Sequence, residues 1–198
     1  MQPIESKVVS RVYGKNRGWV FTPSHFLDLG SRFAVCKALE RLVRRGTIRR
    51  LARGLYDYPR IHPVLGKLPA NYEQIAKALA GKDSLRLQPS GAYAANLLGL
   101  TEQVPAKIIF LTDGANRVLT VDRQQIILKR TTPKNAVTSG RISGLVIQAL
   151  RHLGKEHVDI HIIKKLQKRL STDDKQQLVR DIRYAPAWIG EIFRKMGK

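Results

Sequence analysis

The stretch that decides the fold of the first part of the chain is 31-SRFAVCKALERLVRRGTIRRLARGLYDY-58. In its first half, apolar residues recur every three or four positions, which predicts a helix with one buried side. That apolar stripe consists of Val35, Ala38, Leu39, Leu42 and Val43. Basic residues lie off the stripe, and Gly46 ends the helix after a last turn whose arginines are favoured by the helix dipole.

Two short segments follow the helix, residues 47–51 and 55–58, and the turn between them falls near Arg53 and Gly54. This pattern predicts a β-ribbon. A basic helix that leads directly into a basic β-ribbon is typical of a winged helix-turn-helix. In that fold the helix enters the major groove of DNA and the ribbon lies on the backbone beside it.

The residues before this stretch complete the same pattern. Residues 4–13 are expected to form a first helix, and residues 19–21 a short strand that joins the ribbon. Thr22 and Pro23 begin a short second helix, and Ser31 caps the third. The residues of the second helix that we expect to pack inward are Phe26, Leu27 and Leu29.

The composition indicates a folded protein that binds polyanions. The 198 residues are 43% hydrophobic, and the formal net charge is +21 with a pI of about 10.7. A disordered basic tail is therefore excluded, and nucleic acid is the commonest partner for such a charge, with an acidic protein or an anionic membrane surface as alternatives. Residues 1–60 hold 13 Lys and Arg against 4 Asp and Glu, so they form the denser basic part.

Cysteine use and hydropathy indicate the compartment. Cys36 is the single cysteine, and we expect it to be a structural or surface thiol that forms no internal disulfide. The apolar runs are too short to span a bilayer, and the first residues, MQPIESKVVSRVYG, have no signal-peptide pattern. We therefore expect a cytoplasmic protein without a membrane partner.

Prolines and a glycine between residues 59 and 69 indicate a boundary. The predicted organisation is a winged domain at 1–60, a linker at 61–70 and a second domain at 71–198. In the second domain, helices are expected at 71–80 and 92–98, and a strand at 85–88. Three antiparallel strands are expected at 107–112, 117–121 and 125–130, followed by a loop at 131–140 and a helical end. The predicted fold class is α+β.

Particular segments of the chain are similar to a known family. They are the Gly54-x-Tyr56 end of the ribbon and the segment Ser90-Gly91 to Leu98-Gly99-Leu100, which precedes a KIIFLTDG strand. With these segments the chain resembles the AbiE-type antitoxins (AbiEi family) of bacterial toxin–antitoxin pairs. The resemblance implies a winged helix-turn-helix followed by a mixed α/β antitoxin domain. It also implies repression of the protein's own operon and action against a cognate nucleotidyltransferase-like toxin.

The predicted DNA-binding residues lie on the third helix and the ribbon. They are Ser31, Arg32, Lys37, Arg41, Arg44, Arg45, Arg49, Arg50, Arg53 and Tyr56. Arg32 and Lys37 are candidates for guanine, because the start of a recognition helix reaches base edges. Arg41 and Arg44 are assigned to phosphates, and Arg53 to the backbone or the minor groove. Because side chains alternate along a strand, Arg49, Arg50 and Arg53 cannot all share one face. The alternative is a helix whose charges are only solvated.

Catalytic and metal-binding patterns are weak. Ser90 is better explained as a helix cap than as a nucleophile, because no G-x-S-x-G pattern surrounds it. His152, His157 and His161 lack the further ligands of a zinc set, and no phosphate-binding glycine loop is present. We therefore expect no cofactor, no metal and no enzymatic activity.

Three functions remain open at this stage. The first is an autorepressing antitoxin that binds double-stranded operator DNA as a monomer or weak dimer, with cooperative binding left open, and counteracts its toxin. The second is a non-catalytic module that binds RNA or protein, and the third is an enzyme. The basic C-terminal residues suit DNA, RNA, an acidic toxin or solvent alike. They are Arg151, Lys155, Lys164, Lys165, Lys168 and Arg169.

Overall fold

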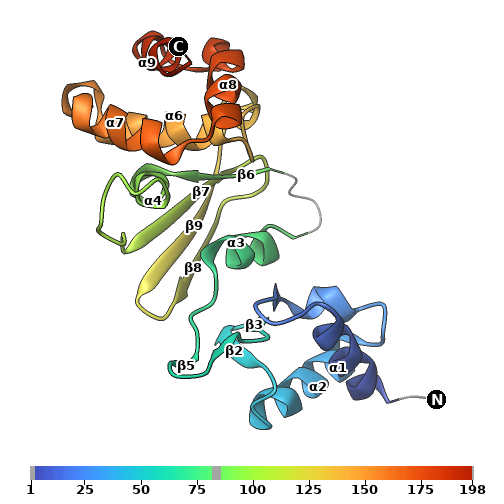
Figure 1. Ribbon diagram of the computed structural model, residues 1–198. Coiled ribbons are helices and arrows are strands. Elements are labelled where there is room, and N and C mark those ends of the chain that lie inside the picture. Colours follow the sequence, from blue (N-terminus) through green and yellow to red (C-terminus); the bar gives the residue numbers. More distant parts are fainter. Residues whose placement is uncertain (1–2, 82–85, 198) are drawn as a thin grey trace. The chain divides into compact units, whose positions relative to one another are not determined.

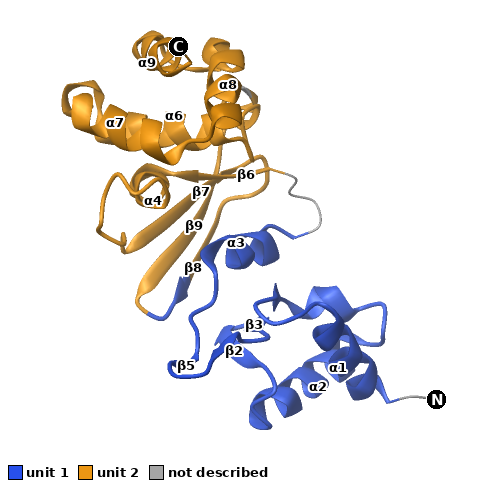
Figure 2. Ribbon diagram, in the orientation of Figure 1, with its two compact units in different colours: residues 1–81, 120–122 blue, residues 82–119, 123–198 orange. Residues whose placement is uncertain are grey.

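The computed structural model describes residues 3–81 and 86–197 and has a mixed α+β fold, as expected (Figure 1). The chain divides into two compact units (Figure 2). Unit 1 comprises residues 1–81 with 120–122, and unit 2 comprises residues 82–119 with 123–198. Each unit is described by itself below.

Unit 1 contains helices, a three-stranded sheet and a small hairpin. In chain order its elements are α1 (Ile4–Gly14), β1 (Val20–Phe21), the 3-10 helix η1 (Pro23–Phe26), α2 (Arg32–Arg44), β2 (Arg49–Ala52), β3 (Leu55–Asp57), β4 (Ile61–His62), β5 (Gly66–Lys67) and α3 (Tyr72–Ala80). The antiparallel sheet has the order β1-β3-β2. The predicted sequence of helix, strand, short helix, helix and ribbon is therefore confirmed.

Helix α2 forms for the reasons that the sequence suggests. The Ser31 hydroxyl accepts a hydrogen bond from the Ala34 amide at 3.3 Å, and Gly46 turns the chain at a φ of +72°. The apolar side of α2 packs into a core with α1, η1 and the sheet. That core includes Val8, Val12, Phe21, Phe26, Val35, Ala38, Leu39, Leu42, Ile48 and Tyr56.

The expectation that Leu27 packs inward is wrong, because 46% of this residue is exposed. Phe26 is fully buried, and Leu29 packs at the edge of the same core. The short second helix is a 3-10 helix with three residues per turn. Leu27 follows directly after this helix, and in either helix type the side chain next to Phe26 points about 100° or more away from it, so Leu27 faces outward when Phe26 faces the core.

Residues 61–70, expected as a linker, contain the β4–β5 hairpin, in which Ile61 pairs with Lys67 and His62 with Gly66. Helix α3 follows, and the Asn71 side chain caps it by accepting hydrogen bonds from two backbone amides. The chain passes from unit 1 to unit 2 after Gly81, and residues 120–122, the end of a later strand with the turn after it, are assigned to unit 1 again.

Unit 2 combines a four-stranded sheet with helices. Its elements are β6 (Leu87–Ser90), α4 (Gly91–Leu97), β7 (Lys107–Thr112), β8 (Arg117–Val121), β9 (Gln124–Arg130), α5 (Pro133–Ala136), α6 (Ile142–Leu153), η2 (Lys155–His157), α7 (Ile160–Arg169), α8 (Thr172–Arg180), η3 (Ile182–Tyr184) and α9 (Ala187–Met196). The predicted strand at 85–88 begins in residues outside the described ones, and the loop expected at 131–140 contains the short helix α5.

The sheet order is β6-β7-β9-β8, and β7 pairs with β9 in parallel. The expectation of three antiparallel strands is therefore wrong for this pair. The loop at 113–116 places β8 two positions away from β7 in the sheet and leaves the position next to β7 empty. A tight turn at Asp122, with a φ of +53°, then returns the chain so that β9 fills the gap.

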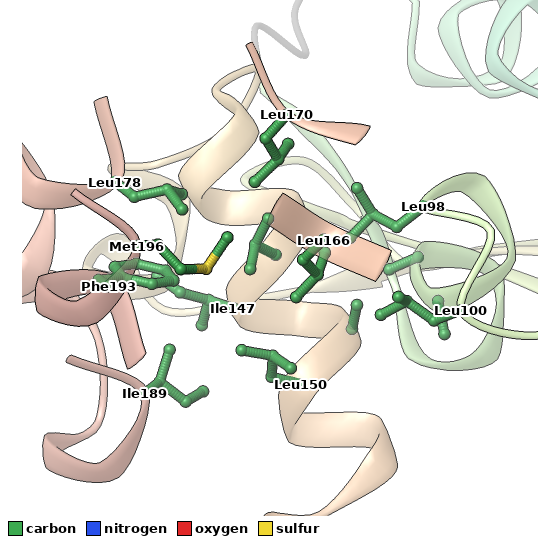
Figure 3. Packing of buried hydrophobic residues seen from close by; sticks show 14 residues of the cluster. Leu98, Leu100, Ile147, Leu150, Leu166, Leu170, Leu178, Ile189, Phe193 and Met196 are labelled. Carbon is green, nitrogen blue, oxygen red and sulfur yellow. The ribbon is translucent and has the colours of Figure 1, made fainter. Parts of the chain in front are cut away.

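The helical end of unit 2 surrounds α6. Figure 3 shows Ile147 and Leu150 of α6 among side chains from α7, α8 and α9 and from the end of α4. The labelled neighbours are Leu98, Leu100, Leu166, Leu170, Leu178, Ile189, Phe193 and Met196. The predicted caps Asp159 and Ser171 hold α7 and α8 through hydrogen bonds to backbone amides.

Candidate nucleic-acid interface

Helix α2 presents an exposed basic side. Arg32 and Lys37 lie in its first two turns and Arg44 at its end, and all three are exposed. Lys37 forms an ion pair with Glu40 at 3.2 Å. Phe33 lies on the same side and is 74% exposed, although an aromatic ring normally gains by burial. Its outward position gives α2 an apolar group among its cations.

Arg41 and Arg45 lie at the border between α2 and α1, where both bind Glu5. The distances from the guanidinium groups to the Glu5 carboxylate are 3.3 Å and 2.5 Å. The carboxylate neutralises part of the charge of this end of α2. These two arginines are therefore less available to an anion than Arg44, although all three belong to the predicted site.

The end of α2 and the ribbon border one groove of about 300 Å³. Its lining residues are Glu40, Val43, Arg44, Arg50 and Tyr56. Arg50 is exposed and lies opposite Tyr56 in the β2–β3 ladder. The structure therefore brings Arg44 of the helix and Arg50 of the ribbon to the same place.

Tyr56 forms the floor of this groove rather than an exposed contact. It is 6% exposed and its ring stacks on Phe21 with 6.1 Å between the centroids. Burial raises the pKa of its phenol, and the nearby Arg50 offsets part of that effect. The hydroxyl therefore stays protonated and keeps a proton to donate.

Arg49 lies on the other face of the ribbon, in keeping with strand alternation. Its guanidinium donates two hydrogen bonds to the buried carboxylate of Asp57 and one to the Leu68 carbonyl. The hydrogen bonding to Asp57 raises the pKa of Arg49. Its hydrogen-bonding capacity is directed into the protein, whereas Arg53 is exposed at the turn before Gly54, whose φ is +74°.

The sequence interpretation missed Phe33, which lies between Arg32 and the apolar stripe. The signal was available, because Phe33 falls off the i, i+3, i+4 pattern of Val35, Ala38 and Leu39. A large aromatic residue outside the buried stripe of a predicted recognition helix is a candidate contact with bases.

Residues with catalytic or metal-binding chemistry are not brought together in the described part of the chain. Among residues 3–81 and 86–197, no three His, Cys, Asp or Glu side chains form a group that could hold a metal ion. Ser90 is at the cap position of α4, but its hydroxyl donates to Gln148 Oε1 at 3.1 Å instead of capping the helix. None of the described helices is long and apolar enough to cross a membrane.

The basic residues near the C-terminus have varied environments. Arg169 donates to the Leu97 carbonyl at 3.0 Å, and Arg151 donates to Asn135 at 3.2 Å. Four lysines are exposed, namely Lys155, Lys164, Lys165 and Lys168. The three histidines of this region, His152, His157 and His161, are also exposed.

Comparisons with known proteins identify a family. A search of curated proteins finds no significant match. Among solved structures, the chain is similar to the RV2827C protein from Mycobacterium tuberculosis, with 16% sequence identity and a TM-score of 0.46, over 100% of this chain and 77% of that one. Residues 7–178 match the model of the DUF6088 family, which is described as a family of unknown function, and the chain therefore belongs to the DUF6088 family.

Proposed function

We propose that unit 1 is a winged helix-turn-helix that binds double-stranded operator DNA. The observation that carries this proposal is the shared groove of Arg44 and Arg50, because it joins a basic helix and a basic ribbon on one surface. The order of elements and the β1-β3-β2 sheet suit this fold. Residues 1–81 also hold 15 Lys and Arg against 5 Asp and Glu, a charge that attracts phosphates.

The residues of the site then have distinct roles. Arg32 and Lys37 at the start of α2 read base edges in the major groove. Arg44, Arg50 and Arg53 bind phosphates of the backbone. Arg41 and Arg45 contribute less because Glu5 holds them. Arg49 and Tyr56 support the ribbon, and Ser31 caps the helix.

The biological role that we propose is an autorepressing antitoxin without enzymatic activity. It is supported by the resemblance to the AbiEi family in residues 90–100 and in the end of the ribbon. In this proposal unit 1 represses the operon in the cytoplasm, and unit 2 counteracts a nucleotidyltransferase-like toxin.

Fluorescence anisotropy with a labelled duplex from upstream of the protein's own gene tests DNA binding. The full chain is expected to bind this duplex more tightly than a scrambled duplex or a structured RNA. The variants Arg44→Ala and Arg50→Ala should each reduce the slope of log affinity against log salt by about 1. Arg194→Ala, which removes an exposed arginine of α9, is the matched control and should leave the slope unchanged. Tighter binding of the RNA would contradict the proposal and favour the RNA-binding alternative.

Co-expression with a nucleotidyltransferase-like gene adjacent to this one tests the antitoxin role. The full chain should restore growth, and the double variant R44A/R50A should still do so while it fails to repress a reporter fused to the operon promoter. Growth arrest that the full chain does not relieve would contradict the antitoxin role and leave the DNA-binding proposal standing.

A further inference from the structure

The β4–β5 hairpin of unit 1 carries an exposed apolar tip. Val64 is 85% exposed, Leu65 71% and Ile61 53%. Three large apolar side chains within five residues leave much nonpolar surface in water, where each would gain free energy by burial. A tip of this kind is a candidate contact surface for a partner.

Hydrogen bonds hold the hairpin in place at its base. Arg17 Nη1 donates to the Pro59 carbonyl at 3.0 Å, and Arg49 Nη2 donates to the Leu68 carbonyl at 3.0 Å. The Leu68 amide donates to the Arg60 carbonyl at 2.9 Å and closes the hairpin. Two arginines therefore fix the residues that enter and leave the hairpin.

The tip itself is also ordered by its own residues. Nδ1 of His62 accepts hydrogen bonds from the amides of Val64 and Leu65, each at 3.2 Å. Gly66 takes a φ of +70°, which suits the return of the chain. Since the apolar side chains are presented on a fixed turn, little conformational entropy is lost when they are covered.

A cationic notch of about 160 Å³ lies at the base of the hairpin, and its lining includes Ile61 and the cations Arg17, Arg45 and Lys67. The lining also includes Tyr13 and Tyr58, and the Arg17 guanidinium lies 4.6 Å from the centroid of the Tyr58 ring. A second notch of about 260 Å³ is lined by Lys15, Arg17, Arg60 and neutral residues. Among the described residues, neither lining contains an aspartate or glutamate. Glu5, outside the lining, pairs with Arg45. The first notch therefore offers Arg17 and Lys67 to an anion.

We propose that the β4–β5 hairpin is an apolar wedge that enters the minor groove of duplex DNA and bends it. Val64 and Leu65 would separate two stacked base pairs. Arg17 and Lys67 of the first notch and Lys15 and Arg60 of the second would bind phosphates on either side of the bend, while Arg45 stays paired with Glu5. Apolar wedges flanked by basic residues act in this way in proteins that bend DNA. The charge of the notches favours DNA as the occupant over an apolar protein surface. The inference rests on the proposed DNA-binding function of unit 1 and adds a deformation of the duplex to it.

The test uses two duplexes of about 30 base pairs, each with a donor dye at one end and an acceptor dye at the other. The first duplex is intact and has a TA step at its centre. The second has a two-nucleotide gap at the same central position. The full chain should raise energy transfer on the intact duplex and bind the gapped duplex about tenfold more tightly, because the gap removes most of the cost of bending. The variant V64S/L65S should still bind the intact duplex within about threefold, but without the rise in energy transfer and without the preference for the gap.

The matched control is V104S/V118S, which changes two other apolar residues that are each 61% exposed. It should behave as the unchanged protein does. Equal energy transfer with V64S/L65S and the unchanged protein would overturn the wedge and leave DNA binding intact. Absence of binding to both of these duplexes and to the duplex from upstream of the protein's own gene would overturn the proposed function itself. Binding to phosphatidylserine vesicles that V64S/L65S abolishes, without any rise in energy transfer on DNA, would show that the tip serves a membrane surface instead.

Discussion

Arg49 and Asp57 lie opposite each other in the β2–β3 ladder and form a bidentate ion pair. Arg49 Nε lies 3.1 Å from Asp57 Oδ1, and Arg49 Nη2 lies 2.7 Å from Oδ2. Asp57 is 1% exposed, so its carboxylate depends on this partner for its charge. The same guanidinium reaches the Leu68 carbonyl, and the pair therefore connects the ribbon to the β4–β5 hairpin.

We predict that Asp57→Ala lowers the free energy of unfolding of unit 1 by about 3 kcal/mol, because it leaves a partly buried guanidinium without its counter-charge. Urea unfolding followed by tryptophan fluorescence measures this, in a background in which Trp188 is replaced by phenylalanine so that Trp19 reports on unit 1 alone. Arg53→Ala is the control, since this exposed side chain should change stability by less than about 0.5 kcal/mol. Equal unfolding midpoints for the two variants would contradict the role of the pair.

Glu5 forms ion pairs with two arginines of the proposed interface, so we predict that removing its charge strengthens DNA binding. Glu5→Gln removes the charge that holds Arg41 and Arg45, so affinity for duplex DNA should rise a few-fold and the salt slope should steepen by about 1. Anisotropy titrations at several salt concentrations measure both. Glu73→Gln makes the same change in net charge on α3, where Glu73 pairs with Lys77. A similar gain from both variants would assign the effect to net charge alone.

Phe33 is expected to contribute to base preference. The exposed aromatic ring of Phe33, on the helix that we propose reads the major groove, suits the methyl group of thymine. Selection from a random duplex library should therefore give a thymine-containing consensus for the unchanged protein, with that position relaxed for Phe33→Ala. Replacing the thymine by deoxyuridine should weaken binding of the unchanged protein and leave Phe33→Ala unaffected. If deoxyuridine has no effect on the unchanged protein, Phe33 does not read the methyl group.

Asp181 makes the stability of unit 2 depend on pH. Burial alone would raise the pKa of this carboxyl, but hydrogen bonds from Ser143 and Gln177 and the charge of Arg141 lower it below its usual 3.8. A carboxylate with a lowered pKa stabilises the folded state fully above pH 3.8, and this contribution is lost as the pH falls through the lower folded value.

The corresponding measurement compares Asp181→Asn with the unchanged residue in a Trp19→Phe background, where Trp188 reports on unit 2. At about pH 6 the variant should unfold at lower urea, and at about pH 3 the difference between the two proteins should narrow. If the difference in urea midpoint between the two proteins is the same at both pH values, Asp181 is not the source of the pH dependence.

Local patterns in the sequence were sufficient for most elements of the fold. The stripe of α2, its Ser31 cap and Gly46 all act within a few residues, so they are visible without the partner elements. The caps of α3, α7 and α8 were predicted for the same reason. The exposure of Leu27 was predicted wrongly, because the prediction placed adjacent apolar residues on one side, whereas in either helix type the neighbour of the buried Phe26 points about 100° or more away from it.

Features that depend on distant residues could not be predicted. The parallel pairing of β7 with β9 follows from how far the loop at 113–116 carries the chain, which the strand patterns do not encode. The orientation of Arg49 is set by its ion pair with Asp57 on the neighbouring strand. From the sequence alone, strand alternation predicted only that the three ribbon arginines cannot share one face, and not which of them points away. The roles of the predicted DNA-binding residues stay predictions until the binding experiments are made.

The β6-β7-β9-β8 order also has a consequence for how the protein is made. During translation β8 leaves the ribosome before β9, the strand that must lie between it and β7. One hydrogen-bonding edge of β7 therefore has no partner strand until residue 130 has emerged. Nascent chains in which residues 107–112 have left the ribosome but residues 124–130 have not should accordingly recruit chaperones or aggregate more than chains in which both segments have left it.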